Sequence, residues 1–252
     1  MKALLENSEF VSLPGENYYI FAGGTKPYHA GHNQLIEGII EDAAKDPTGA
    51  GKAVIFVGLG SRPPVMSDQV LQVWQKYIEP YLQQKAESLG VPLHIEYGGG
   101  PIGKVLYMLK QASDACERGE GVSNKFFIYS DPEDTEANYL TRKFSKRNPE
   151  KELASSPPKY YKALSEFEPC PINFMSLVDP SRFTRGEGTP DISGTTMRSF
   201  ISSGDFSSFA AGLPAWMDIV AADIYEMYRS NLDSPDEAAL REHFSRFFAS
   251  KG

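Results

Sequence analysis

Residues 17–40 read NYYIFAGGTKPYHAGHNQLIEGII, and this stretch decides how the first part of the chain folds. An aromatic and aliphatic run over residues 17–22 stops at two glycines, which is typical of a buried strand that ends in a turn. Apolar residues then recur at helical spacing, at Leu35, Ile36, Ile39 and Ile40. The stretch predicts a strand over 17–22, a loop, and a helix over about residues 32–45.

The loop between this strand and this helix has the chemistry of a phosphate-binding site. It offers backbone N–H groups beside glycines, the positive end of a helix dipole, the ammonium of Lys26 and the imidazoles of His29 and His32. Gly31 lets a ligand approach the backbone, and imidazoles donate hydrogen bonds to phosphate oxygens. A helix start with two solvated histidines is the plainer alternative. A zinc site is disfavoured, because the sequence has no Cys/His cluster to supply further ligands.

Strands and helices alternate along the rest of the chain. Apolar runs predict strands at 53–58, 93–97, 125–130 and 172–177, and periodic segments predict helices at about 67–82, capped by Ser67, and 102–117. Such alternation favours a parallel sheet covered on both faces, with ligands at the carboxyl ends of its strands. We therefore expect an α/β protein with a doubly wound, parallel five-stranded sheet. Residues 1–214 would form this domain, and residues 215–252 a C-terminal helical extension packed on it.

Composition excludes several classes of function. The 252 residues are 41% hydrophobic and carry a net charge of −8, which argues against a general electrostatic grip on nucleic acid. Cys116 and Cys170 lie far apart and are predicted to be buried packing residues. No apolar run approaches the ~18 residues that a membrane span needs, and the N-terminus lacks the pattern of a signal peptide. We expect a cytoplasmic protein without nucleic-acid or membrane partners, and a homo-oligomer stays open.

A second phosphate-type motif opens a later predicted helix. Residues 191–198 read DISGTTMR, and Ser and Thr at a helix start satisfy backbone N–H groups. With an arginine in the first turn, the same groups can also hold a triphosphate. The alternative is an ordinary capped helix with a solvated arginine. The candidate binding residues of this motif are Ser193, Gly194, Thr195, Thr196 and Arg198.

Together the two motifs resemble those of the nucleotidyltransferase superfamily. Its members carry His-x-Gly-His after the first strand and a late Ile-Ser-x-Thr-x-x-Arg loop, which are HAGH at 29–32 and ISGTTMR at 192–198 in this chain. The likeness extends to Gly23 and Pro27 before the first motif, and over residues 204–214 after the second. One position departs from the pattern, because many relatives have an aromatic residue where this chain has Thr25.

The resemblance implies a Rossmann-like nucleotidyltransferase fold and an activity. A nucleoside monophosphate would pass from a nucleoside triphosphate to a small phosphorylated metabolite, by direct in-line attack, with release of pyrophosphate. By resemblance the catalytic residues are His29, His32 and Arg198. The remaining contacts to the nucleotide fall on Gly23, Gly24, Thr25, Lys26, Gly31, Ser193, Gly194, Thr195 and Thr196. Mg²⁺ is the expected cofactor, held mainly by phosphate oxygens and water rather than by protein ligands.

Several alternatives stay open. ATP is favoured because Arg198 follows Thr195 by three residues, as in adenylyltransferases of the nicotinamide-mononucleotide and phosphopantetheine types. A cytidylyltransferase that uses CTP is the alternative within the superfamily, although Arg185 matches its usual motif only in part. A catalytically inactive, nucleotide-binding relative is an alternative of another class. The segment KFSKR at 143–147 suggests a class I aminoacyl-tRNA synthetase, but it precedes the fifth predicted strand, whereas the second motif follows it.

Overall fold

The structure is a computed structural model. It describes residues 15–98, 100–105, 108, 111, 118–119, 125–130, 144–145, 148–152, 175–177, 192–230 and 232. Most of the predicted 102–117 helix, the loop 131–135 and the basic segment before Phe144 lie outside the described residues. Cys116, Cys170, Arg185 and residues 233–252 of the predicted C-terminal extension lie outside them as well.

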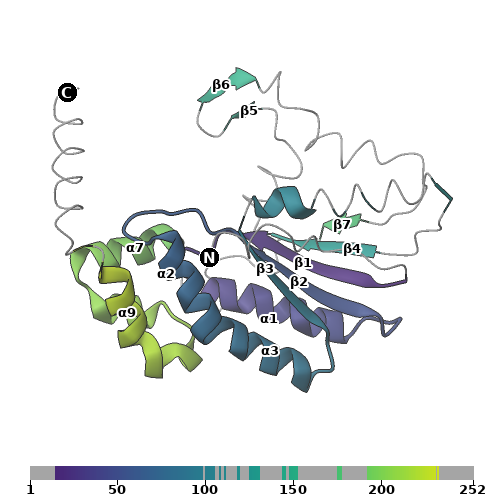
Figure 1. The fold of residues 1–252 in the computed structure, drawn as a ribbon, viewed down its shortest axis with the longest axis horizontal. Helices are drawn as coiled ribbons and strands as arrows, with labels where there is room; N and C mark the ends of the chain where they lie inside the picture. The colour runs from purple at the N-terminus through teal and green to yellow at the C-terminus, as the bar shows by residue number, and fades with distance from the viewer. Residues whose placement is uncertain are drawn as a thin grey trace.

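A parallel sheet forms the centre of the molecule (Figure 1). Its strands are β1 (Asn17–Gly23), β2 (Gly51–Val57), β3 (Leu93–Tyr97), β4 (Lys125–Tyr129) and, at the edge, the short β7 (Met175–Leu177). They pair in the order β3-β2-β1-β4-β7, and every pair is parallel. A separate antiparallel pair joins β5 (Phe144–Ser145) to β6 (Asn148–Glu152). The expected α/β class with a parallel sheet is confirmed.

Helices follow the strands much as predicted. They are α1 (Ala30–Ala44), α2 (Ser67–Val73), the π-helical turn η2 (Trp74–Ile78), α3 (Glu79–Ser88), α7 (Gly194–Ser203), α8 (Phe206–Ala211), the 3₁₀ segment η5 (Ala215–Val220) and α9 (Ala221–Arg229). The predicted Ser67 cap is wrong. Ser67 is already helical, Met66 precedes the helix, and the Met66 N–H donates to Gln69 Oε1 at 2.9 Å. Gln69 therefore takes the capping role that local pattern assigned to Ser67.

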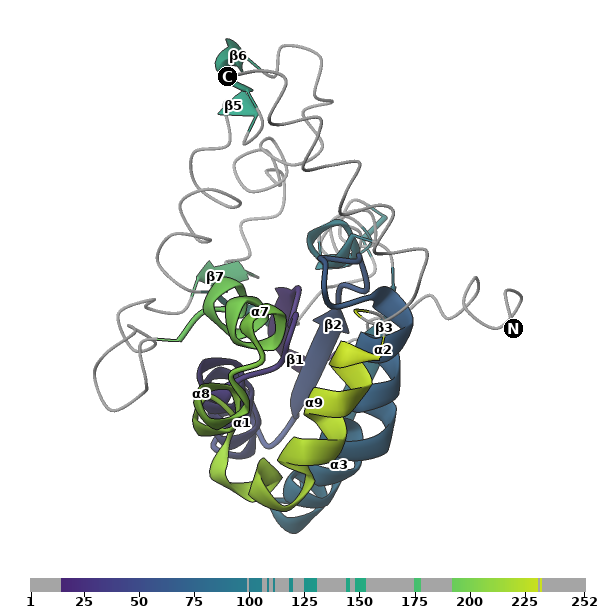
Figure 2. The ribbon, with the colours of Figure 1, turned by 90° about the vertical axis from the view of Figure 1, so that its left-hand side faces the viewer.

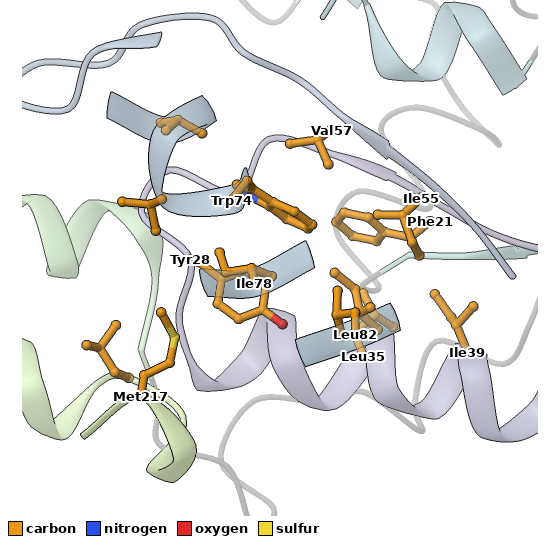
Figure 3. Close-up of a cluster of buried hydrophobic side chains, with 14 of the residues drawn as sticks. Phe21, Tyr28, Leu35, Ile39, Ile55, Val57, Trp74, Ile78, Leu82 and Met217 are labelled. Atoms are coloured by element: carbon orange, nitrogen blue, oxygen red, sulfur yellow. The ribbon is translucent and has the colours of Figure 1, made fainter. Parts of the chain in front are cut away.

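Both faces of the sheet are buried. Tyr19, Phe21 and Ile55 pack with side chains of α1 and of the α2–α3 helix on one face (Figure 3). The alternate residues Ile20 and Val54 point to the opposite face and are also fully buried. On that face the Lys104 ammonium lies 5.8 Å from the centre of the Phe56 ring. The expectation that the second strand is covered on both sides is confirmed.

The direction in which successive strands are added to the sheet reverses beside β1. The chain builds outward from β1 to β2 and β3, then returns to pair β4 with the other side of β1. At such a point neighbouring loops leave the carboxyl end of the sheet in opposite directions and open a crevice for ligands. The predicted phosphate loop leaves β1 at this change of direction.

The C-terminal helices belong to the same core. Met217 of η5 and Ile224 and Tyr228 of α9 are buried in the cluster that contains α1 and α2 residues. The Gln69 amide donates to the Met227 carbonyl at 2.6 Å, which ties α9 to α2 (Figure 2). Within the part of the chain that the structure describes, no helix is both long and apolar enough to cross a membrane.

Candidate functional site

The loop after β1 is joined to the loop after β2. The Gly58 N–H donates to the Gly23 carbonyl at 2.9 Å, which draws the two loops together. Lys26 lies between them and is only 9% exposed. A Cβ at Gly60 would lie 3.2 Å from the Lys26 Nζ, and one at Gly24 would lie 3.5 Å from it. Because Gly24 and Gly60 have no side chains, the Lys26 side chain has room between them.

Thr25 differs from its predicted role. Its side chain is fully buried, and its hydroxyl oxygen accepts the Trp74 Nε1–H at 2.7 Å. The hydroxyl is thus directed into the core and is not placed for contact with a ligand.

His29 and His32 form a close ring pair at the start of α1. Their ring centres are 3.8 Å apart. His29 caps the helix, because its Nδ1 accepts the Gly31 N–H at 3.2 Å. Since Nδ1 accepts this bond, the neutral ring carries its proton on Nε2, the position from which an imidazole can donate to a ligand oxygen. A Cβ at Gly31 would lie 3.2 Å from the His29 ring, so glycine allows the ring to fold over the helix start.

The first backbone N–H groups of α1 already have partners within the protein. The Ala30 N–H donates to the Gly212 carbonyl at 3.0 Å, and the Gly31 N–H serves the His29 ring. The sequence predicted an open helix terminus with Gly31 as a phosphate ligand. In the structure, both of these N–H groups are hydrogen-bonded within the protein, so neither is free for a phosphate.

The second motif starts α7 as predicted. Ser193 is the N-cap, and its hydroxyl accepts the Thr196 N–H at 3.1 Å. The Thr196 hydroxyl lies 2.9 Å from the Ser193 hydroxyl, and Thr195 accepts from Arg198 Nη2 at 2.9 Å. These contacts order the hydroxyls around the first turn of a helix, where the dipole favours an anion.

Arg198 joins the two motifs. Its Nη1 donates to the Lys26 carbonyl at 2.7 Å, across 172 residues of sequence. The approach is close, because a Cβ at Gly194 would lie 2.9 Å from the same carbonyl oxygen. The structure thus brings the loop after β1 and the start of α7 into direct contact, as a shared phosphate site requires.

Three cations meet at this contact. Burial lowers the pKa of Lys26, and the positive charges of Arg62 and Arg198 lower it further. Burial and the charge of Arg62 also lower the pKa of Arg198. None of the ion pairs in the described part of the chain includes Lys26, Arg62 or Arg198. Like charges held together without a carboxylate cost free energy, which an anionic ligand would recover.

Arg62 was not among the residues predicted to bind the triphosphate. It follows β2, and its backbone pairs with Val65 in a short bridge that holds the loop at the carboxyl end of the sheet. Its position after an apolar strand was the available signal, since neighbouring parallel strands end at one edge. The sequence predicted the loop that begins with Arg62 as a contact for the acceptor substrate, not for the triphosphate.

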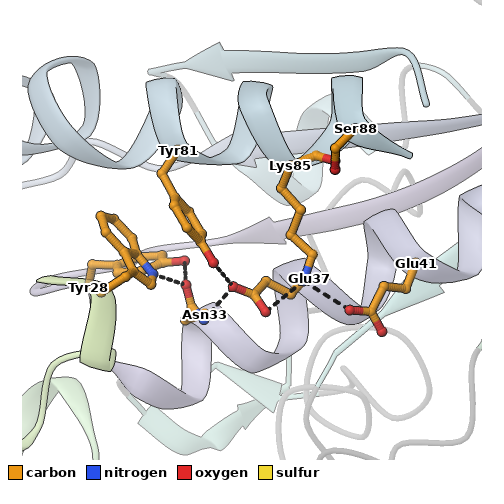
Figure 4. Close-up of polar contacts among 8 residues, drawn as sticks. Tyr28, Asn33, Glu37, Glu41, Tyr81, Lys85 and Ser88 are labelled. Carbon is orange, nitrogen blue, oxygen red and sulfur yellow. Dashed lines mark hydrogen bonds and ion pairs between the residues drawn. The ribbon is translucent and has the colours of Figure 1, made fainter. Parts of the chain in front are cut away.

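A polar network supports α1 behind the histidines (Figure 4). Asn33 Oδ1 accepts from the Tyr28 hydroxyl at 3.1 Å and from Trp216 Nε1 at 2.9 Å. The Asn33 amide donates to Glu37 at 2.9 Å, and Glu37 also accepts from Lys85 at 2.8 Å. These hydrogen bonds lower the pKa of the Glu37 carboxyl against the opposing effect of burial. The network links α1 to α3 and η5. It does not include Lys26, Arg62 or Arg198, which we call the cation cluster.

The donors at the cation cluster do not form a metal site of their own. Across the described residues, no group of three or more His, Cys, Asp or Glu side chains is arranged to hold a metal ion. The cluster consists of cations, imidazoles and hydroxyls, whereas Mg²⁺ prefers carboxylate, phosphate and water oxygens.

Comparison with known proteins adds no relative, because no family model, no curated protein and no solved structure matches the chain.

Proposed function

We propose that the chain is a nucleotidyltransferase that transfers AMP from ATP to a small phosphorylated acceptor and releases pyrophosphate. The observation that carries the proposal is the contact of Arg198 with the Lys26 carbonyl at 2.7 Å, which unites two phosphate-type motifs around cations that form no ion pair among the described residues. The parallel sheet, with its change of direction beside β1, is compatible with the doubly wound, Rossmann-like fold of that superfamily.

The chemistry needs no covalent intermediate on the protein. An oxygen of the acceptor phosphate forms a bond to the α-phosphorus of the triphosphate, and the bond from that phosphorus to the α,β-bridging oxygen breaks. The electron pair of the broken bond stays on the bridging oxygen, which leaves with pyrophosphate. Negative charge grows on the bridging and non-bridging oxygens during the transfer, and placed donors lower the barrier by stabilising it.

The residues divide this work by their position. Arg198, Ser193 and Thr195 at the start of α7 hold the β- and γ-phosphates, because the helix dipole and the guanidinium favour anions there. His29 and His32 donate to the transferring phosphate, and Lys26 lies between the two motifs where the acceptor phosphate would enter. Mg²⁺ would offset triphosphate charge through phosphate oxygens, and no protein residue is assigned to it.

The test is Mg²⁺-dependent pyrophosphate release, with ATP and CTP in parallel. The acceptors are nicotinamide mononucleotide, phosphopantetheine, and a set of sugar and alcohol phosphates. We expect release with ATP and one acceptor, and a strong loss in Arg198→Ala with a smaller loss of thermal stability. Release with CTP alone would move the assignment to a cytidylyltransferase. Nucleotide binding without any release would support a binding or regulatory protein, and absence of both would contradict the proposal.

A further inference from the structure

The indole of Trp74 reaches the loop after β1 from the middle of a helix. Its Nε1–H donates to the Thr25 hydroxyl oxygen at 2.7 Å, and both side chains are fully buried. Breaking this bond would leave two buried polar groups unsatisfied, which costs more than the bond itself contributes. Because Thr25 directly precedes Lys26, the bond fixes the backbone from which the lysine projects.

The same indole supports the other end of the loop. Its ring packs edge-on against Tyr28, with ring centres 5.5 Å apart and planes at 83° (Figure 3). Tyr28 in turn stacks on His32, with ring centres 5.9 Å apart. Edge-on and stacked aromatic contacts prefer defined geometries, so the Trp74 ring constrains the position of Tyr28, and Tyr28 constrains that of His32. Trp74 thus contacts the residues on both sides of the Lys26–Pro27 segment.

A π-helical turn brings Trp74 to this place. Trp74 is the first residue of η2, and Pro80 follows two residues after η2 ends. Proline lacks an N–H, and its ring clashes with the carbonyl four residues earlier, which interrupts α-helical hydrogen bonding in this segment. The wider π turn absorbs the interruption, and such turns are frequent at functional sites.

We propose that Trp74 is a positioning residue of the candidate site. It holds the loop after β1 in the conformation in which the Lys26 carbonyl accepts from Arg198 and the His29 and His32 rings lie together. The inference rests on the proposed function, because it takes this loop to bind the reacting phosphates. The aromatic residue that the chain lacks at position 25 is then supplied by η2.

The test compares variants that break one hydrogen bond from either side. Trp74→Phe keeps a ring and removes the donor, Thr25→Val keeps the shape and removes the acceptor, and Thr25→Ser keeps the hydroxyl. We expect Trp74→Phe and Thr25→Val each to lower kcat by about tenfold with a smaller change in KM, because misplaced catalytic groups slow the chemical step. The double variant should lose little more than either single one, since both remove the same bond. Thr25→Ser should retain near-normal kcat.

Trp216→Phe is the matched control. Trp216 is the other tryptophan of the chain, and its Nε1–H also donates to a side-chain oxygen, Asn33 Oδ1 at 2.9 Å. It stacks on Tyr81 of α3, with ring centres 4.0 Å apart. Its loss should lower thermal stability and leave kcat per folded molecule unchanged. If Trp74→Phe and Thr25→Val behaved in the same way, the positioning role would be overturned.

Pyrophosphate binding, measured by calorimetry, separates this inference from the proposed function. If no substrate pair is turned over, pyrophosphate should still bind about threefold to tenfold more weakly to Trp74→Phe than to Trp216→Phe. That result would keep the positioning role while the transferase fails. Equal affinity of the two variants would overturn the role, and no binding to the unaltered protein would contradict both proposals.

Discussion

Charged side chains at the two ends of the parallel sheet have opposite kinds of surroundings. At the amino end, the Asp46 carboxylate accepts from Asn17 Nδ2 at 2.9 Å, from the Tyr19 hydroxyl at 2.8 Å and from the Thr48 N–H at 2.8 Å. These donors outweigh burial and lower the pKa of Asp46 to about 2. At the carboxyl end, Lys26 and Arg198 lie near Arg62, and the pKa values of Lys26 and Arg198 are lowered first by burial and then by the neighbouring positive charges.

The difference separates stability from function. The charge at the amino end is satisfied by the chain itself, so it stabilises the fold without a ligand. A pocket at that end is lined by Glu16 and Lys52, which form an ion pair with each other. Burial and mutual repulsion of the cations at the carboxyl end oppose folding, and under our proposal an anionic ligand offsets this cost. Substitutions at the two ends should therefore change different measurements.

The largest expected effect is the loss of turnover in His32→Ala. Removal of a donor that stabilises transition-state charge should lower kcat by about 10²-fold or more. Pyrophosphate release by folded protein is the measurement. The control is His94→Ala, since His94 lies on β3 beside Glu96 and its side chain is 38% exposed. Turnover of His32→Ala close to that of His94→Ala would contradict the assignment of His32.

Next in size is the loss of stability in Asp46→Asn. The folded-state pKa of about 2 lies below the unfolded value near 3.8, so the carboxylate stabilises the fold above about pH 4 and loses this effect as pH falls toward 2. The change should lower the free energy of unfolding at neutral pH by about 2 kcal/mol and flatten its decline in acid. Urea unfolding at several pH values measures both. Asp68→Asn, an exposed change in α2, should alter neither by more than about 1 kcal/mol, and kcat of folded Asp46→Asn should stay normal.

Gly194→Ala tests the close approach of the two motifs. The added Cβ would lie 2.9 Å from the Lys26 carbonyl, so α7 must move away from the loop after β1. We expect triphosphate affinity to fall by about tenfold, because both loops would no longer reach the same anion. Calorimetric titration with ATP measures this. Gly100→Ala is the control, since a Cβ there meets no atom within 4 Å. Unchanged affinity in Gly194→Ala would show that the contact does not shape the site.

The smallest expected effect is that of Arg62→Ala. The substitution should weaken ligand binding without lowering stability. Removal of one of three like charges should weaken pyrophosphate binding by about threefold to tenfold. The same change should leave stability equal or raise it by a few tenths of a kcal/mol, because it relieves repulsion at an exposed position. Lys45→Ala removes a charge at the far end of α1 and should leave binding unchanged. A clear loss of stability in Arg62→Ala would mean that the cations support the fold instead of a ligand.

Much of the fold followed from short-range pattern. The apolar run and the glycines of residues 17–24 predicted β1, and the edges of β3 match the predicted 93–97. Ser193 caps α7 because a hydroxyl acts on an N–H only a few residues away. Such local rules failed at Ser67, where the side chain of Gln69 took the capping role, and at α1, which begins at Ala30 because His29 caps it.

A signal for the π turn was present in the sequence but was not used. Val70, Trp74, Ile78 and Leu82 recur at every fourth position, and all four are fully buried. A helix with 3.6 residues per turn would rotate such residues away from one face by about 40° at each step. A wider turn resets the phase, so strict four-residue spacing around Pro80 indicates the π-helical segment.

The sequence alone determined the strands of the parallel sheet, the start of α7 at Ser193 and the two phosphate-type motifs, because spacing, caps and turns act over a few residues. Tertiary structure decided what these pieces do together. The contact of Arg198 with the Lys26 carbonyl, the third cation Arg62 and the support of Thr25 by Trp74 all join distant segments. Strand order and helix packing bring such residues together, and neither can be read from a local pattern. The Gly31 N–H is a further example. It donates to the His29 ring instead of facing a ligand, and the sequence does not give the position of that ring.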